Sequence, residues 1–79
     1  MTYESLIEVI AKSIFVDGSS LSMDSSAETV EEWDSLGHIS ILSALDEATD
    51  GKSADIVELT QATSVREISD LLKENGLLN

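Results

Sequence analysis

The chain contains no cysteine, and this absence limits the ways in which so short a sequence can hold a fold. A chain of 79 residues buries only a small core, and such domains usually need disulfides, a metal ion or very regular helix packing. Without cysteine there is neither a disulfide framework nor a Cys-based zinc site, and the single histidine excludes a multi-histidine metal cluster. We therefore expect no metal site and a core made by packed helices.

The composition is strongly acidic, with sixteen acidic and four basic residues and a formal net charge of −12. Between Ser13 and Val65 the only basic residue is Lys52, against eleven carboxylates. Such a surface repels nucleic acid and anionic lipid and favours partners with basic surfaces. A hydrophobic content of 42% is too high for a disordered acidic tail. No stretch approaches the ~20 apolar residues of a membrane span, and no signal peptide is visible. We expect a monomeric, cytoplasmic protein.

Apolar periodicity predicts an all-α fold in a single domain, residues 1–79. Apolar residues recur at helical spacing over residues 2–15 and 35–49, and a short helix is predicted after Ser53. The last helix follows a capping box at Ser64 and stops before Gly76. Residues 16–29 read as a long serine-rich loop, and no stretch alternates like a strand. The prediction is a small four-helix bundle with three longer helices and one short one.

The predicted helix over residues 35–49 has a candidate N-cap at Asp34 or Ser35 and a stop at Asp50-Gly51. Its apolar positions are expected to form one broad apolar face: Leu36, Ile39, Ile41, Leu42 and Leu45. The aromatic residues are expected to anchor the core: Tyr3, Phe15 and Trp33.

The sequence Asp34-Ser35-Leu36 places one serine hydroxyl where this helix begins, directly after an acidic run. Taken alone, a serine in this position is usually a helix cap. With Trp33 before it and Gly37-His38 after it, the segment resembles the prosthetic-group attachment site of the acyl carrier proteins. Two further runs extend the resemblance over nearly the whole chain: Ala44-Leu45-Asp46-Glu47 and Thr63-Ser64-Val65.

The resemblance implies a carrier with a four-helix fold of the acyl-carrier type. In that family a phosphopantetheinyl transferase moves the phosphopantetheine arm of coenzyme A onto the motif serine, here Ser35. The thiol of the arm then holds an acyl group as a thioester. A carrier of this kind has no catalytic residue of its own and presents its cargo to acyl-loading, condensing or acyl-transfer enzymes with basic docking surfaces. The sequence around Ser35 looks most like that of stand-alone carriers in specialised lipid, surface-glycan or secondary-metabolite assembly.

The same resemblance assigns roles to residues around Ser35. Asp34 would help to engage the transferase and its metal-bound coenzyme A, and Leu36 would contact partner enzymes as an exposed apolar side chain or pack partly in the core. An acidic face recognised by basic partners would comprise Asp46, Glu47, Asp50 and Asp55.

Two other functions stay open. A carrier of amino acids or peptides would use Ser35 in the same way and differ only in its cargo. An unmodified acidic interaction module would need Ser35 only as a helix cap. A hydrolase triad of Asp34, Ser35 and His38 is set aside, because the acid of a triad lies behind the histidine and Asp34 adjoins the serine. A calcium loop beginning at Asp46 is set aside because its twelfth position is Val57, not a glutamate.

Overall fold

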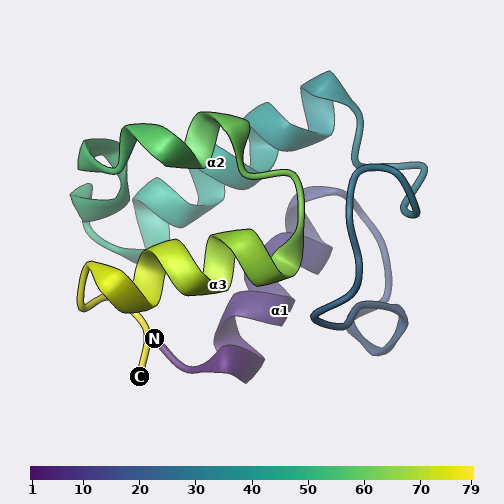
Figure 1. The fold of residues 1–79 in the computed structure, drawn as a ribbon. Coiled ribbons are helices and arrows are strands. Elements are labelled where there is room, and N and C mark those ends of the chain that lie inside the picture. Colours follow the sequence, from purple (N-terminus) through teal and green to yellow (C-terminus); the bar gives the residue numbers. More distant parts are fainter.

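Three α-helices form where apolar periodicity and capping residues coincide in the sequence. The computed structural model describes residues 1–79 and contains α1 (Tyr3–Ser13), α2 (Ser35–Ala48) and α3 (Val65–Glu74) (Figure 1). Each helix begins after a capping side chain that accepts the backbone N–H three residues later: Thr2, Asp34 and Ser64. No strand is present beyond an isolated bridge between Ser26 and Ser64. The predicted all-α class is confirmed.

The predicted short helix after Ser53 is instead two 3₁₀-helices, η2 (Lys52–Asp55) and η3 (Val57–Gln61). Its buried residues recur every third position: Ser53, Ile56, Leu59 and Ala62. That spacing matches the three residues per turn of a 3₁₀-helix rather than the 3.6 of an α-helix. At Ile56 the backbone leaves helical values, with φ −95° and ψ 87°, and so separates the two segments. The chain thus has three α-helices where four helices were predicted.

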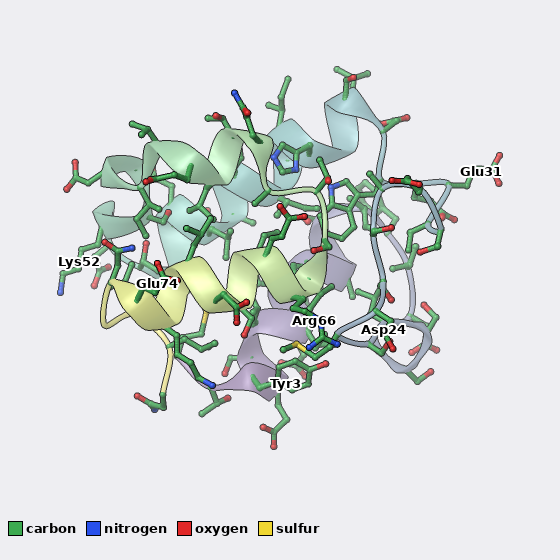
Figure 2. All side chains as sticks on the ribbon, in the orientation of Figure 1. Tyr3, Asp24, Glu31, Lys52, Arg66 and Glu74 are labelled. Carbon is green, nitrogen blue, oxygen red and sulfur yellow. The ribbon has the colours of Figure 1, made fainter.

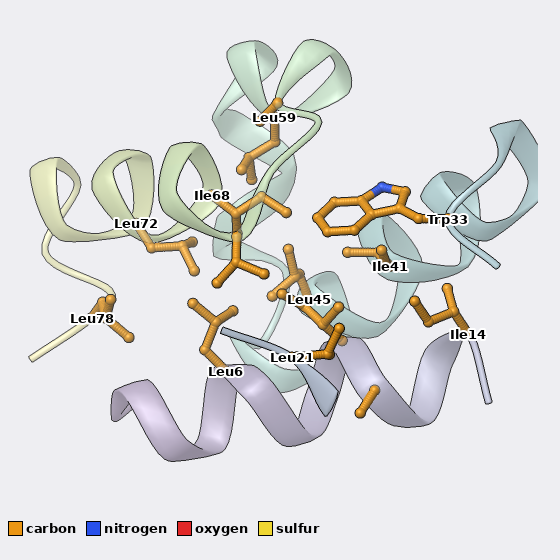
Figure 3. Close-up of a cluster of buried hydrophobic side chains, with 14 of the residues drawn as sticks. Leu6, Ile14, Leu21, Trp33, Ile41, Leu45, Leu59, Ile68, Leu72 and Leu78 are labelled. Carbon is orange, nitrogen blue, oxygen red and sulfur yellow. The ribbon is translucent and has the colours of Figure 1, made fainter. Parts of the chain in front are cut away.

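Fifteen buried apolar residues make one core between the three α-helices and η3 (Figure 3). Fully buried pairs come from each α-helix: Leu6 and Ile10, Ile41 and Leu45, Ile68 and Leu72. Trp33 is the one aromatic residue in this core, as predicted. The prediction for Phe15 is wrong, since its side chain is 92% exposed, and Tyr3 lies at the surface with 36% exposed.

All three α-helices end in the same backbone motif, in which the residue after the C-cap adopts a left-handed conformation. These residues are Phe15 (φ 61°), Asp50 (φ 55°) and Gly76 (φ 74°). The following N–H then donates to the carbonyl five residues earlier, at 2.8 to 3.0 Å. Glycine suits this position because it has no Cβ. Phe15 adopts the left-handed conformation at a steric cost, and its ring is exposed to solvent just after the end of α1.

The long connection between α1 and α2 is fixed against the start of α3. It contains a 3₁₀-helix, η1 (Gly18–Ser20), and its Leu21 is buried. Backbone hydrogen bonds join Ala27 N–H to the Thr63 carbonyl (2.8 Å) and Val65 N–H to the Ser25 carbonyl (3.0 Å). The side chain of Arg66 donates to Asp24 at 3.0 Å (Figure 2). The predicted long loop is therefore present, and it is ordered by contacts with a distant part of the sequence.

The two ends of the chain lie together, on the opposite side of the molecule from the start of α2 (Figure 1). The N–H of Asn79 donates to the carbonyl of Met1 at 2.9 Å, and Leu78 is buried in the core. No helix has the length and apolar content that crossing a membrane requires.

Replacing Phe15 by glycine should stabilise the fold. The exposed ring contributes almost no packing, while a side chain in the left-handed region costs roughly 1–2 kcal/mol. The greater freedom of glycine in the unfolded chain offsets part of this gain. We expect Phe15→Gly to raise the free energy of unfolding by roughly 0.5–1 kcal/mol in urea titrations. Phe15→Ala, which keeps a Cβ, is the matched control and should show no such gain; an equal gain in both variants would contradict the strain argument.

The carboxylate of Asp17 should titrate at lower pH than an ordinary aspartate. The backbone N–H of Ser19 and then its hydroxyl donate to Asp17 Oδ1, both at 3.0 Å, and hold the pKa of Asp17 below its usual 3.8. Because the pKa is lowered on folding, this group's contribution to stability is full above the unfolded-state pKa and is lost as pH falls through the folded-state pKa. Carboxyl NMR titration should show the low midpoint, and Ser19→Ala should raise it part of the way. A midpoint at or above 3.8 in the unmutated chain would contradict this.

Candidate functional site

Ser35 is the first residue of α2, and its side chain is exposed. The helix is capped by Asp34, whose Oδ1 accepts the Gly37 N–H at 2.8 Å, so the hydroxyl of Ser35 is not used as a cap. The backbone N–H groups of Ser35 and Leu36 have no acceptor within the chain. A free hydroxyl and two free N–H donors therefore lie together at the positive end of the helix dipole.

The start of α2 is held by a close crossing of the preceding loop. A Cβ at Gly37 would collide with the backbone oxygen of Glu32 and lie 3.2 Å from Ile14 Cγ2. Glycine at this position lets the loop and the end of α1 pack directly against the first turn of α2. Glycine is required at position 37 because the loop packs so closely against α2, and this packing fixes the backbone two residues after Ser35.

Trp33 and His38 form a hydrogen-bonded chain that joins the first turn of α2 to η3. Trp33 Nε1–H donates to His38 Nδ1 at 3.1 Å, and His38 Nε2 lies 3.0 Å from the carbonyl oxygen of Leu59. Because Nδ1 accepts, the proton of the neutral ring lies on Nε2, which donates to Leu59. The two rings are nearly parallel, at an interplanar angle of 15°. His38 is half-buried, and neither of its two hydrogen-bond partners was predicted from the sequence.

An open cleft of about 650 Å³ lies beside Ser35. Residues of the long loop, α2 and the segment before α3 line it: Ala27, Trp33, Asp34, Ser35, His38, Ile39, Leu42, Thr60 and Thr63. An adjoining cleft of about 390 Å³ shares Ile39, Leu42 and Thr60 and continues as far as Asp46. A hollow between α2 and η3 therefore leads from Ser35 toward the other end of the helix. A separate cleft of about 520 Å³ between α1 and η1 includes no residue predicted to act in function.

The apolar residues of α2 do not share one face. Ile41 and Leu45 are fully buried, whereas Leu36 and Ile39 are 76% and 61% exposed. Leu36 precedes Leu45 by nine residues, about two and a half turns, so the two side chains must face opposite sides of the helix. The predicted single apolar face is thus divided into a buried and an exposed part, and Leu36 has the exposed one of its two predicted placements. Together with Val57, which is 71% exposed and lines the same cleft as Ile39, they form the apolar patch.

The four carboxylates predicted to meet partners lie at the far end of α2 and in the segment after it. Glu47, Asp50 and Asp55 are exposed, while Asp46 is half-buried and its Oδ1 has no hydrogen-bond partner. Ser35 and Asp46 are eleven residues apart, about 16 Å along the helix. No group of three or more histidine, aspartate or glutamate side chains is arranged to hold a metal ion. Of the predicted site residues, the structure brings together Asp34, Ser35 and Leu36 and separates this group from the four carboxylates.

Comparison with known proteins adds no assignment to this site. A scan against protein-family models, a search of curated proteins and a search of solved structures found no match to the chain. The basis for assigning a function is therefore the sequence around Ser35 and the geometry that surrounds it.

Gly37→Ala should destabilise the fold although alanine is the better helix former. The added Cβ meets the Glu32 backbone, which cannot move as a flexible side chain would, so we expect a loss of about 1–3 kcal/mol in the free energy of unfolding. Gly18→Ala is the matched control, because its Cβ would lie 3.7 Å from Ile7 Cγ2, an ordinary contact. Chemical denaturation of both variants measures the difference. Equal stability of the two would show that the loop does not need to cross so close to α2.

Proposed function

We propose that this protein is an acyl carrier whose phosphopantetheine arm is attached to the hydroxyl of Ser35. The observation that carries the proposal is the exposed, uncapped hydroxyl at the first position of α2, within the Asp34-Ser35-Leu36 sequence. Because Asp34 caps the helix, modification of Ser35 would leave the cap intact. A packing of three α-helices with 3₁₀-helices in place of the short fourth helix is compatible with the small carrier fold.

The residues around Ser35 suit a covalently attached phosphate. In the attachment reaction Ser35 Oγ forms a bond to the phosphorus that carries pantetheine, and the pyrophosphate bond of coenzyme A breaks. Adenosine 3′,5′-bisphosphate leaves, and the serine proton passes to a base of the transferase. The unpaired N–H groups of Ser35 and Leu36 would hold the resulting phosphodiester, and the helix dipole offsets part of its repulsion by the acidic surface.

The arm supplies what the chain itself lacks, since a terminal thiol can hold an acyl group as a thioester on a protein without cysteine. The chain's own contribution is to orient the arm and its cargo. The cleft beside Ser35 has mainly apolar walls, with Ile39 and Leu42 on one side and hydroxyls of Thr60 and Thr63 on the other. Such a cleft would take up the arm or the first part of the cargo.

The surface next to Ser35 suits partner enzymes with an apolar pocket and a basic rim. The apolar patch lies along α2 and η3, with Asp34 at one end of the helix and Glu47 and Asp50 at the other. Burial of the patch would supply contact energy, and the net charge of −12 would speed encounter with a basic surface. The transferase and the acyl-loading, condensing or acyl-transfer enzymes are partners of this kind. A carrier of amino acids would present the same surface, because the loading enzyme selects the cargo.

Intact-mass measurement tests the proposal directly. The protein is incubated with coenzyme A, magnesium and a broad-specificity phosphopantetheinyl transferase, and we expect its mass to increase by one phosphopantetheine. Ser35→Ala should show no increase, while Ser40→Ala, which alters an exposed serine of the same helix, should behave like the unmutated chain. Since Asp34 provides the cap, Ser35→Ala should change the free energy of unfolding by less than the ~1 kcal/mol of a lost cap.

An unchanged mass with several transferases, in a protein shown to be folded, would contradict the carrier proposal. The unmodified interaction module would then be the function to pursue, with the apolar patch as its binding surface.

A further inference from the structure

The indole of Trp33 separates the cleft beside Ser35 from the buried core. It lines the cleft and at the same time belongs to the core, where it is only 2% exposed. Figure 3 shows the ring pointing into the cluster of buried side chains from the segment that precedes α2. A group attached at Ser35 that moved inward from this cleft at the first turn of α2 would therefore meet this ring.

The indole is held in place by hydrogen bonds that cross between two elements. Trp33 Nε1–H donates to His38 Nδ1 at 3.1 Å, and His38 in turn donates to the carbonyl of Leu59, 21 residues away in sequence, at 3.0 Å. We call these two hydrogen bonds the Trp33–His38–Leu59 latch. The side chain of Leu59 is itself buried, so the carbonyl that ends the latch lies on a fixed part of η3.

We propose that this latch keeps the carried group out of the core and in the cleft beside Ser35, an inference that rests on the proposed carrier function. An alkyl chain entering the core from the cleft beside Ser35 would have to displace the indole. Both hydrogen bonds would break, and the Trp33 N–H and the His38 nitrogens would lose their partners in largely apolar surroundings. The chain would also have to fit into a core already filled by fifteen packed residues.

The latch therefore selects the class of cargo. The cleft beside Ser35 is open to solvent and provides Ile39, Leu42 and the hydroxyls of Thr60 and Thr63 as contacts. The adjoining cleft between α2 and η3 is open as well, so a long saturated chain lying along both clefts would still expose one side to water, which is unfavourable. A short acyl group, or one that carries polar groups, loses little by staying outside. Trp33 and His38 are thus positioning residues that favour short or polar acyl groups.

Chemical attachment of an alkyl chain tests the latch without any transferase. The chain has no cysteine, so Ser35→Cys provides a single thiol. Its thiolate attacks decyl methanethiosulfonate, a disulfide to the decyl chain forms, and methanesulfinate leaves. Methyl NMR spectra of the leucine and isoleucine side chains, recorded before and after attachment, then report where the chain lies.

We expect the decyl chain to shift the methyl signals of Ile39 and Leu42 in the cleft and to leave those of Leu45 and Ile68 in the core unchanged. With His38→Ala added, the chain should enter the core, so that the Leu45 and Ile68 signals shift as well. Trp33→Phe, which retains a ring but removes the donor, is a second variant with the same expected result. Thr60→Ala, which changes the cleft but not the latch, is the matched control and should keep the core signals unchanged.

Shifts of the Leu45 and Ile68 signals in the Ser35→Cys protein with an intact latch would overturn the proposal. So would a decyl chain that stays in the cleft in both folded latch variants. These outcomes are separate from failure of the carrier proposal, which is judged by the mass of the unmutated protein after incubation with a transferase.

Discussion

The burial of Trp33 is the interaction on which the geometry around Ser35 depends. Trp33 immediately precedes the capping residue Asp34, so burial of the indole in the core also fixes where the long loop ends and α2 begins. Removal of a buried aromatic side chain typically costs about 3–5 kcal/mol, whereas loss of a cap costs about 1 kcal/mol. Packing of the indole thus dominates the position of the helix start, and the cap refines it.

The α-helices could be predicted because their signals are local. Caps at Thr2, Asp34 and Ser64 lie next to residues with helical periodicity, and each helix begins within a residue of its predicted start. The 3₁₀-helices η2 and η3 were missed because the short apolar run after Ser53 was taken for a single helix, although its buried residues recur at a spacing of three. Phe15 was placed inside because it is aromatic, whereas its exposure follows from the left-handed turn after α1. That turn carries no glycine to mark it.

The candidate site was predictable at Ser35 and much less so around it. The position of the serine follows from sequence alone, since a cap and a periodic segment adjoin it. The contact between Gly37 and the Glu32 backbone depends on how the loop crosses the helix, and the bond from His38 to Leu59 joins residues 21 apart. Neither has a local sequence signal. The apolar patch did have a local sequence signal, because the five apolar positions in α2 cover too wide an arc of the helix for a single buried face.

The meeting of the two chain ends has a practical consequence for how this molecule can be held. Met1 and Asn79 are hydrogen-bonded to each other on the side opposite the start of α2 (Figure 1). A tether or fusion at either end would emerge from the same edge and leave both the Ser35 hydroxyl and the apolar patch unobstructed. A surface coated with the protein through either terminus would present the same face to an approaching partner.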